Sequence, residues 1–384
     1  MLPADDALFN TFDVESNLNG MKINKPTLVV DLDRVEANIR RMATKMQDNG
    51  LIFRPHFKTH QSHFIARIFR KYGVEKCTVS SVSMAAYFAQ DGWTDITIAF
   101  PANVLEAEEM NDLAARIQLN ILVDSVEKVN LLASRISASV TLFIEVDTGY
   151  FRSGIFHENV DEMAKIIDAI ISFRYFTFAG FLSHTGNTYS QSSAQNIVQL
   201  FDESRRKLSD LKRHFSPKYS DIVLSMGDTP AASLAEKFDG IDEMRPGNFV
   251  FYDLMQLSLG SCRDTNIGVA VYCPVVAIYP ERNELVIYGG AVHLSKEKTT
   301  WKQREIYGLV SFPTSDGFGI PMKEAFVSGL SQEHGIVSMP AHELEKIKLG
   351  DILAVFPVHS CLTADLNSHL LSLDGDRIEK YRTY

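Results

Sequence analysis

The sequence has 384 residues, 45% of them hydrophobic and 22% charged, a balance typical of a folded globular protein with room for more than one core. Its formal net charge of −10 argues against nucleic acid or an anionic membrane surface as a partner, because both require a basic surface. No apolar run reaches the about 18 residues of a membrane span, and Asp5 and Asp6 stand where a signal peptide carries positive charge. We therefore expect a cytoplasmic protein.

Strand-like and helical segments alternate along the first two thirds of the chain. A β-branched run at 27–30 predicts a strand, and Asp33 is the expected N-cap of an amphipathic helix at 35–46. Eight further strands are predicted at 51–53, 77–81, 95–99, 120–123, 141–146, 176–183, 221–225 and 243–251. Helical periodicity separates most of them, at 103–117, 126–136, 160–171 and 194–215. Eight βα units indicate a closed (β/α)8 TIM-type barrel, whose functional residues lie at the C-terminal ends of the strands.

The pattern changes beyond residue 253. Strands are predicted at 269–278, 284–287, 308–310 and 352–358, the turns between them are short, and only 343–348 has helical character. We therefore predict an α/β protein of two domains. The barrel occupies residues 27–255, and a mostly β domain occupies residues 256–384 together with the N-terminal arm 1–26.

Lys58 stands at the end of the first predicted barrel strand, between a proline and two histidines. Lysine normally stays in water. At such a place its stem either lies on apolar surface with the charge in solvent, or the amine is desolvated and becomes a nucleophile. The local sequence leaves both interpretations open.

Two other predicted strand ends carry candidate binding groups. The turn Gly227-Asp228-Thr229-Pro230 precedes a helix, so its backbone N–H groups are able to hold a phosphate, although an N-capped turn explains the same residues. Arg152 follows another strand and has two possible roles. It either pairs with a carboxylate or faces a pyridine nitrogen, which a guanidinium would keep unprotonated.

His359 and Cys361 follow the apolar run at 352–357. Residues two apart on a strand share one side, so the imidazole and the thiol are able to bind one metal ion, and this ligand pair favours zinc. A buried cysteine beside a hydrogen-bonded histidine is the alternative. His56, His60 and His63 form a second cluster, for which aromatic packing is the favoured interpretation.

Taken together, these motifs resemble the D-threonine aldolase and D-serine dehydratase family, which has the alanine racemase fold of pyridoxal-phosphate enzymes. The likeness extends from about residue 26 to 374 and keeps the motif order. Its motifs are 55–60 (PHFKTH), 147–154 (DTGYFRSG), 183–186 (SHTG), 245–253 (RPGNFVFYD), 331–335 (SQEHG) and 359–361 (HSC).

The resemblance implies a role for each matching residue. Lys58 would bind pyridoxal 5'-phosphate covalently and act as the catalytic base, and His359 and Cys361 would bind a divalent metal, expected to be zinc. Asp228 replaces the family's usual serine, so its side chain must turn away from the phosphate, and Asn187 stands where histidine is common. The remaining cofactor-binding positions are Arg152, His184 and Tyr189 around the pyridine ring, with Arg152 or Tyr189 facing its nitrogen, and Gly227, Asp228, Thr229 and Tyr252 near the phosphate.

For the reaction, the resemblance implies D-serine dehydratase-like elimination from a D-β-hydroxy amino acid, giving a keto acid and ammonia. Retro-aldol cleavage is the nearest alternative. In this family aldolases usually pair the metal-binding histidine with aspartate, whereas dehydratases have cysteine, as at Cys361. A racemase would need a second base opposite Lys58, and non-catalytic carriers of the cofactor lack the second domain. The resemblance also implies a homodimer.

Overall fold

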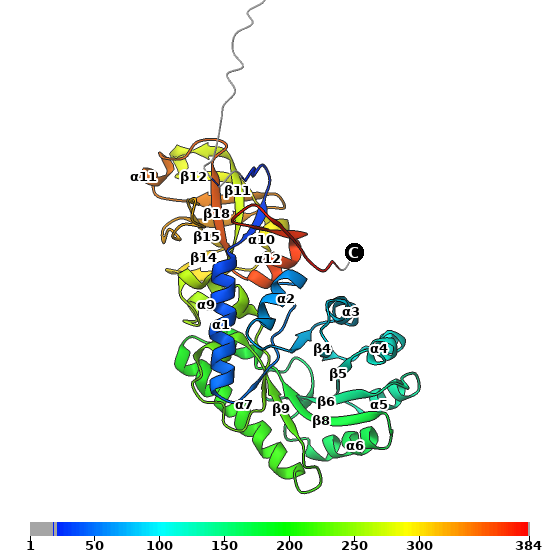
Figure 1. Cartoon of the computed structure of the whole chain (residues 1–384). Coiled ribbons are helices and arrows are strands. Elements are labelled where there is room, and N and C mark those ends of the chain that lie inside the picture. Colours follow the sequence, from blue (N-terminus) through cyan, green and yellow to red (C-terminus); the bar gives the residue numbers. More distant parts are fainter. Residues whose placement is uncertain (1–17, 19–20, 383–384) are drawn as a thin grey trace, which may run out of the picture.

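The computed structural model describes residue 18 and residues 21–382, so Asp5 and Asp6 and most of the N-terminal arm lie outside the described residues. Two units make up the fold (Figure 1). A barrel with helices around it forms one unit, and a β-rich domain stacks on one end of it. Within the described residues, no helix has both the length and the apolar character needed to cross a membrane.

Eight parallel strands form the first unit, as the alternating pattern predicts. Their order is β2-β10-β9-β8-β6-β5-β4-β3. The first and last strands meet through a bridge between His56 and Thr78, where the Phe57 amide donates to the Thr78 carbonyl at 2.8 Å. This contact closes the (β/α)8 barrel. The strands are β2 (Ile52–Phe53), β3 (Lys76–Val79), β4 (Asp95–Pro101), β5 (Gln118–Val123), β6 (Val140–Asp147), β8 (Phe176–Ser183), β9 (Val223–Met226) and β10 (Glu243–Met244), and the short β7 (Ile155–Phe156) pairs with β6.

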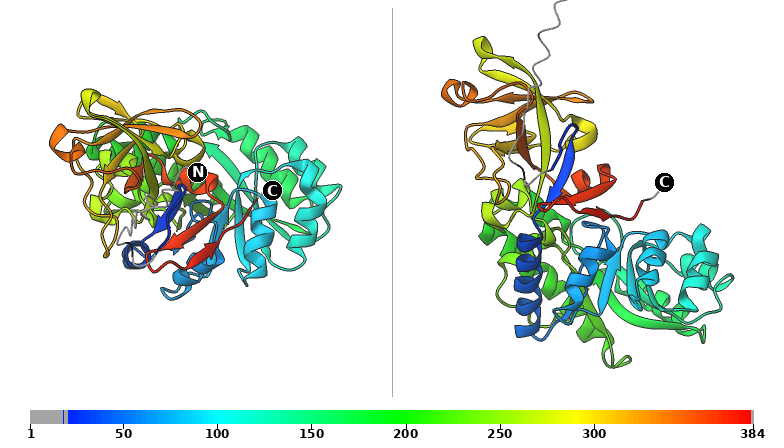
Figure 2. Two further views of the ribbon diagram at one scale, coloured as in Figure 1. Left: turned by 90° about the horizontal axis from the view of Figure 1, so that it is seen from above. Right: turned by 45° about the horizontal axis from the view of Figure 1, so that its top comes forward.

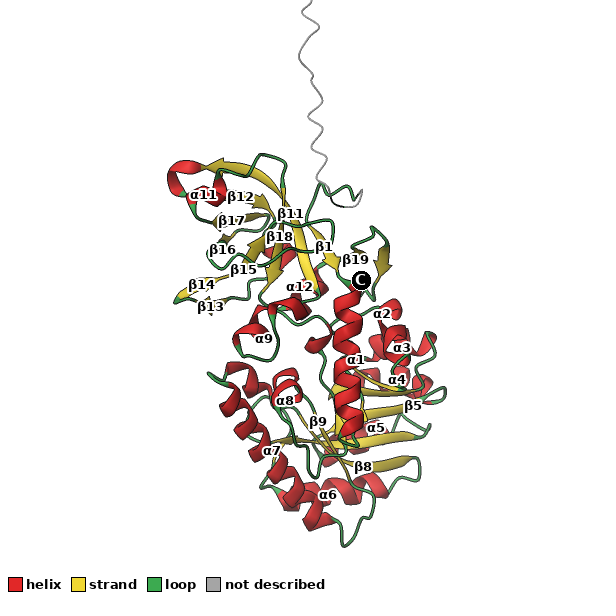
Figure 3. Cartoon of the chain, turned by 60° about the vertical axis from the view of Figure 1, so that its left-hand side comes forward, coloured by secondary structure: helices red, strands yellow, loops and turns green. Residues whose placement is uncertain are grey.

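Helices cover the outside of the barrel (Figure 3). α1 buries Val35, Ile39, Met42 and Met46, a spacing that keeps one helical face on the core. The N-cap of α1 is Asp31 and not Asp33, because Asp31 Oδ1 accepts the Arg34 amide at 3.0 Å. These helices are α1 (Leu32–Asp48), α2 (His63–Arg70), α3 (Val82–Gln90), α4 (Ala107–Ala114), α5 (Val126–Ala133), α6 (Val160–Ile171), α7 (Ala194–Phe215) and α8 (Thr229–Leu234). The short helix α9 (Leu254–Ser258) instead lies at the junction with the β domain (Figure 3).

The second unit is built on an antiparallel sheet that closes on itself. β11 pairs with both β12 and β18, so the path β11-β12-β17-β16-β15-β18 is closed. The mostly β character is therefore confirmed, although helices occur beyond the single expected segment. The elements are β11 (Val269–Tyr279), β12 (Glu284–Tyr288), β13 (Thr299–Trp301), β14 (Arg304–Ile306), β15 (Gly308–Ser311), β16 (Phe326–Leu330), β17 (His334–Ser338), β18 (Ile352–Pro357), β19 (His369–Ser372), β20 (Arg377–Glu379), α10 (Ala291–Leu294), α11 (Ala341–Leu344) and α12 (Ser360–Leu366).

The first strand of the chain does not belong to the barrel. β1 (Thr27–Val30) pairs antiparallel with β11 and parallel with β19, so it extends the second sheet, where it lies beside the last strands of the chain (Figure 2). The expectation that the barrel unit starts at residue 27 is therefore wrong for this strand. The three apolar residues in a row, from Leu28 to Val30, suit a strand covered on both faces in either unit, so the local pattern does not select the sheet.

Candidate active site

A cavity of about 670 Å³ lies where the C-terminal ends of the barrel strands meet the β domain. Its floor includes Leu122 and Leu182, which pack with Phe143 in a small apolar cluster separate from the main core. Most of the predicted polar residues line this one space. From the barrel come Lys58, Arg152, His184, Tyr189 and Asp228, and from the β domain come His359 and Cys361.

Lys58 reaches this cavity because its neighbour Phe57 turns the other way. Phe57 is fully buried, with its ring centroid 4.8 Å from that of Trp93 and 4.9 Å from that of Phe88. The Lys58 side chain is exposed to the cavity, and its backbone amide donates to His56 Nδ1 at 3.3 Å. The aromatic anchor therefore fixes the loop and leaves the amine free to react.

Two of the three histidines that line the cavity, His56 and His184, are uncharged. Burial and, next, the nearby Arg152 charge lower the pKa of His184 to about 3, although Nδ1 donates to the Gly227 carbonyl, which acts in the opposite direction. Burial likewise lowers the pKa of His56, with Lys58 and Arg245 adding to the effect. At neutral pH these two imidazoles are therefore neutral, beside the lysine and arginine side chains of the cavity.

The glycine turn after β9 is tightly packed. A Cβ on Gly227 would lie 2.8 Å from the Cβ of Arg245, so a larger residue does not fit. Asp228 caps α8, where Oδ1 accepts the Ala231 amide at 2.6 Å and the Thr188 hydroxyl at 3.1 Å, and Oδ2 accepts the Thr185 hydroxyl. The carboxylate is thus engaged by these donors, as expected for a side chain that must turn away from a phosphate.

Three predicted positions have other surroundings. The Thr229 amide donates to the Tyr189 hydroxyl at 3.3 Å, which joins the turn to the cavity wall. Tyr252 does not line the cavity, and its hydroxyl contacts Ser233 Oγ on α8 at 3.2 Å. Asn187, where the family commonly has histidine, donates to the Gly149 carbonyl at 3.3 Å.

Sequence reasoning gave no role to two residues that line the cavity. Arg245, after β10, is 4% exposed and donates to the Ser183 carbonyl and to Ser225 Oγ, both at 2.7 Å. Glu145, on β6, accepts the Ser153 hydroxyl at 2.7 Å through Oε1, and burial raises its pKa. Both residues stand in or beside recognised motifs. Their position at a predicted strand end could have marked them as candidate site residues, but ordinary turn residues also occur at strand ends.

His359 and Cys361 do come together, although not on a strand. β18 ends at Pro357, His359 is the N-cap of α12, and Cys361 lies in its first turn. Burial opposes charge on both groups, but their mutual contact dominates and lowers the pKa of Cys361 while raising that of His359. The thiol is therefore disposed to the thiolate form that binds metal. Among the described residues, no group of three or more His, Cys, Asp or Glu side chains is arranged around a common metal position.

The other two histidines of the cluster His56, His60 and His63 pack against aromatic rings. His60 is stacked on Phe69, with ring centroids 5.7 Å apart. His63 is stacked on Tyr87 with centroids 3.7 Å apart, and its Nε2 lies 2.8 Å from the Tyr87 carbonyl oxygen. These contacts agree with the packing interpretation.

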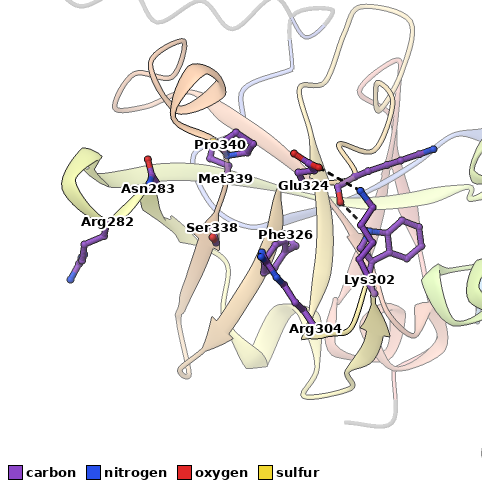
Figure 4. Close-up of a pocket in the computed structure, with 11 residues that line it drawn as sticks. Arg282, Asn283, Lys302, Arg304, Glu324, Phe326, Ser338, Met339 and Pro340 are labelled. Atoms are coloured by element: carbon purple, nitrogen blue, oxygen red, sulfur yellow. Dashed lines mark hydrogen bonds and ion pairs between the residues drawn. The ribbon is translucent and has the colours of Figure 1, made fainter.

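A second cavity, of about 530 Å³, lies on the β domain (Figure 4). Four cationic side chains line it: Arg282, Lys302, Arg304 and Lys323. Lys302 is 3.6 Å from Glu324, and Arg304 lies over the Phe326 ring. No histidine or cysteine is among its described lining residues, so it lacks the imidazoles and the thiol that the first cavity gathers around Lys58.

Comparison with known proteins identifies the family. The model of the alanine racemase N-terminal domain matches residues 30–254, and a serine dehydratase domain model matches residues 268–373. The chain belongs to this alanine racemase-like family. Its membership confirms the resemblance carried by the motifs and the expected barrel architecture.

Two of the similar proteins match nearly the whole chain, and an aldolase matches part of it. A D-serine dehydratase from Dictyostelium discoideum is 28% identical, over 96% of this chain and 98% of that protein. The structure of D-threo-3-hydroxyaspartate dehydratase from Delftia sp. HT23 is 26% identical, with a TM-score of 0.87 over 96% of this chain and 99% of that one. A 3-hydroxy-D-aspartate aldolase from Paracoccus denitrificans is 28% identical over 60% of this chain and 61% of that protein.

Proposed function

We propose that this chain is a pyridoxal-phosphate-dependent lyase that acts on D-β-hydroxy amino acids by D-serine dehydratase-like elimination. One observation carries the proposal: Lys58 and the pair His359 and Cys361, which lie about 300 residues apart in the sequence, line the same cavity. The end-to-end likeness to a D-serine dehydratase and to a hydroxyaspartate dehydratase supports elimination. An elimination requires both a base at Cα and help for the departing hydroxyl, and this cavity gathers groups suited to both tasks.

The residues fit the cofactor. The close-packed turn at Gly227 leaves room only for backbone, as a phosphate cradle requires, and the rings of His184 and Tyr189 line the same cavity. Arg152 and Arg245 give the cavity positive charge for a phosphate and a carboxylate. When bound, pyridoxal 5'-phosphate supplies an electron sink for charge that develops at Cα.

Lys58 is the proposed catalytic base. Its amine would take the Cα proton of the substrate, while Arg152 or Tyr189 would face the pyridine nitrogen and Arg245 would add positive charge beside the anionic groups. His359 and Cys361 would hold a divalent metal, in our proposal zinc, which supplies Lewis acidity for the β-hydroxyl. Structures of D-threo-3-hydroxyaspartate dehydratase include a histidine-to-alanine variant and a cysteine-to-alanine variant in the metal-free form. The two replaced residues lie two positions apart, as His359 and Cys361 do.

Retro-aldol cleavage is the second candidate, favoured by the partial likeness to aldolases. The distinction rests on Cys361, since the family's aldolases usually have aspartate beside the histidine. Incubating the enzyme with D-serine and D-threonine, with and without a chelator, and assaying keto acid, ammonia, glycine and aldehyde separates the two reactions. We expect keto acid and ammonia, lost with chelator and restored by zinc. Glycine as the main product would instead establish cleavage.

The lysine assignment has its own test. Lys58→Ala should lose the absorption band of the lysine-bound cofactor and lower kcat by at least about 10³-fold, because both the covalent link and the base disappear. Lys302→Ala removes an exposed lysine from the other cavity and serves as the control, with band and activity unchanged. A Lys58→Ala protein that keeps the band would refute the assignment.

We also propose a homodimer. Phe100, Tyr150 and Leu362 line the cavity and are exposed, so apolar surface surrounds its mouth. A second copy of the chain would cover this surface. Light scattering on the protein as it elutes from a size-exclusion column should give about twice the chain mass of 43.1 kDa. A fully active protein with the mass of one chain would refute this proposal.

A further inference from the structure

Asp253 is a fully buried carboxylate that joins the barrel to the metal pair. It follows the last barrel strand, and its Oδ1 accepts the Gln256 amide at 2.9 Å as the N-cap of α9. Its Oδ2 accepts Asn248 Nδ2 at 2.6 Å, the Ser360 amide at 2.9 Å and the Ser360 hydroxyl at 3.2 Å. Because Ser360 begins α12, these bonds fix the first turn of the helix that carries Cys361.

The same oxygen faces the imidazole of His359. Asp253 Oδ2 lies 3.4 Å from His359 Nδ1, and Nδ1 is itself buried with no hydrogen-bond partner among the described residues. Within the described part of the chain, His359 is also the only side chain that pairs with Asp253 as a possible cation. Burying a carboxylate without a positive partner costs free energy. A slightly shorter distance between Nδ1 and Oδ2 would let Nδ1–H donate to Oδ2 and would satisfy both groups.

The amide of Asn248 connects this arrangement to the thiol. Its Nδ2 lies between Asp253 Oδ2 and Cys361 Sγ, at 2.6 Å and 3.5 Å, and Thr59 Oγ1 contacts the same sulfur at 3.2 Å. Thr59 directly follows Lys58. The supports of the metal pair therefore come from the barrel, although the pair belongs to the β domain.

We propose that Asp253 is the positioning residue of the metal site: it receives His359 Nδ1–H, which leaves Nε2 to bind the metal, and it anchors the turn that presents Cys361. This inference rests on the proposed metal-binding role of His359 and Cys361. A carboxylate or carbonyl that accepts the second ring N–H fixes the tautomer and orientation of a metal-binding histidine, and its loss typically weakens metal binding about 10- to 100-fold.

The test measures zinc binding on the cofactor-loaded enzyme by competition with a chromophoric chelator. We expect Asp253→Asn to raise the Kd for Zn²⁺ about 10- to 100-fold and to change the thiolate-to-metal absorption band of the Co²⁺-substituted protein. Asp31→Asn is the matched control, since Asp31 is another buried N-cap aspartate but lies in the first strand–helix turn, outside the cavity lining. Its Kd should stay within about 2-fold of the wild-type value.

The outcomes separate this inference from the proposed function. Wild-type protein that binds zinc while Asp253→Asn binds it equally well, even with a lower melting temperature, would show a purely structural role and overturn the inference alone. Wild-type protein that binds no zinc would overturn the metal role and the inference together. If Asp253→Asn does not fold, Ser360→Ala removes one donor to Oδ2 and should weaken zinc binding about 3-fold. An unchanged Kd for Ser360→Ala would then decide against the inference.

Discussion

At the scale of single residues, the cavity has a charge pattern suited to anionic molecules. Lys58, Arg152 and Arg245 line it, whereas burial lowers the pKa values of His56 and His184 and keeps both rings neutral. A cofactor phosphate and a substrate carboxylate bring several negative charges, which these cations offset in a partly dehydrated space.

Asp228 predicts a pH dependence of stability. Burial raises the pKa of this carboxyl to about 6, against hydrogen bonds from Thr185, Ala231 and Thr188 that lower it. The folded protein therefore binds the proton more tightly than the unfolded chain, whose reference pKa is 3.8. The contribution of Asp228 to the free energy of unfolding is therefore fully present below about pH 4 and is lost as the pH rises through about 6. The loss amounts to about 3 kcal/mol, because each pKa unit corresponds to about 1.4 kcal/mol.

Asp228→Asn should remove this dependence, because asparagine caps helices well and does not titrate. Urea unfolding of the cofactor-free proteins at several pH values between 4.5 and 7 measures the effect. The wild-type free energy of unfolding should fall relative to that of the variant as the pH increases. Parallel curves across this range would show that the Asp228 carboxyl does not titrate there.

At the scale of elements, the approach of two loops at the barrel mouth explains a glycine in the last barrel motif. A Cβ on Gly247 would lie 2.8 Å from the His56 carbonyl oxygen and 2.9 Å from the His56 Cβ. Any larger residue must push away the segment that carries Lys58. The loop after β10 therefore sets the place of the loop after β2.

Gly247→Ala should destabilise the protein by about 1–3 kcal/mol, the usual cost of overpacking, and should weaken binding of pyridoxal 5'-phosphate by displacing Lys58. Thermal melting and cofactor titration measure the two effects. Gly329→Ala is the control, because a Cβ there meets only Ile336, at 3.6 Å. Equal effects of the two substitutions would contradict a special role for the close approach at Gly247.

An element can be predicted from the sequence when the residues that determine it are close together in the chain. The eight barrel strands could be located because apolar runs alternate with helical periodicity, even though β2 and β10 are only two residues long. The sheet to which β1 belongs depends on partners more than 200 residues away, at β11 and β19. α12 was not expected, since its N-cap His359 makes no side-chain capping bond and the preceding run continues as a strand pattern.

Site residues could be predicted where a single short motif contains the reactive side chain. Lys58, His184 and the pair His359 and Cys361 follow from motifs recognised in order, and the structure brings them to one cavity. Asp253 lies in a recognised motif, but its contact with Ser360 bridges 107 positions. No periodicity in the sequence reports such a contact, so its role emerges only from the fold.

At the scale of the whole molecule, the ends of the described chain hold the two units together. β1 starts in the β domain and leads into α1 of the barrel. At the other end, the Tyr381 amide donates to the Gln61 carbonyl at 2.6 Å and its hydroxyl donates to Ser83 Oγ at 2.6 Å, so the C-terminal segment returns to the barrel. The cavity between the units is therefore enclosed by both, and each supplies groups that the other lacks.

This division predicts where substrate choice is made. The barrel contributes the cations together with Glu145 and Asp228, and the β domain contributes Glu297, an exposed carboxylate that lines the cavity. D-Serine has one carboxylate and hydroxyaspartate has two, so repulsion from Glu297 disfavours the second substrate. Glu297→Gln should raise kcat/KM for D-threo-3-hydroxyaspartate relative to D-serine about 2- to 5-fold at low salt, a modest effect because water and ions screen an exposed charge.

Measuring both substrates at low and high ionic strength checks this prediction. The gain from Glu297→Gln should shrink in high salt, since screening already weakens the repulsion in the wild-type enzyme. Glu324→Gln removes an exposed glutamate from the other cavity of the β domain, so it changes the net charge equally and should leave the ratio unchanged. If both variants shift the ratio alike, the effect comes from overall charge. If neither does, selection between the two substrates is made by the barrel side chains alone.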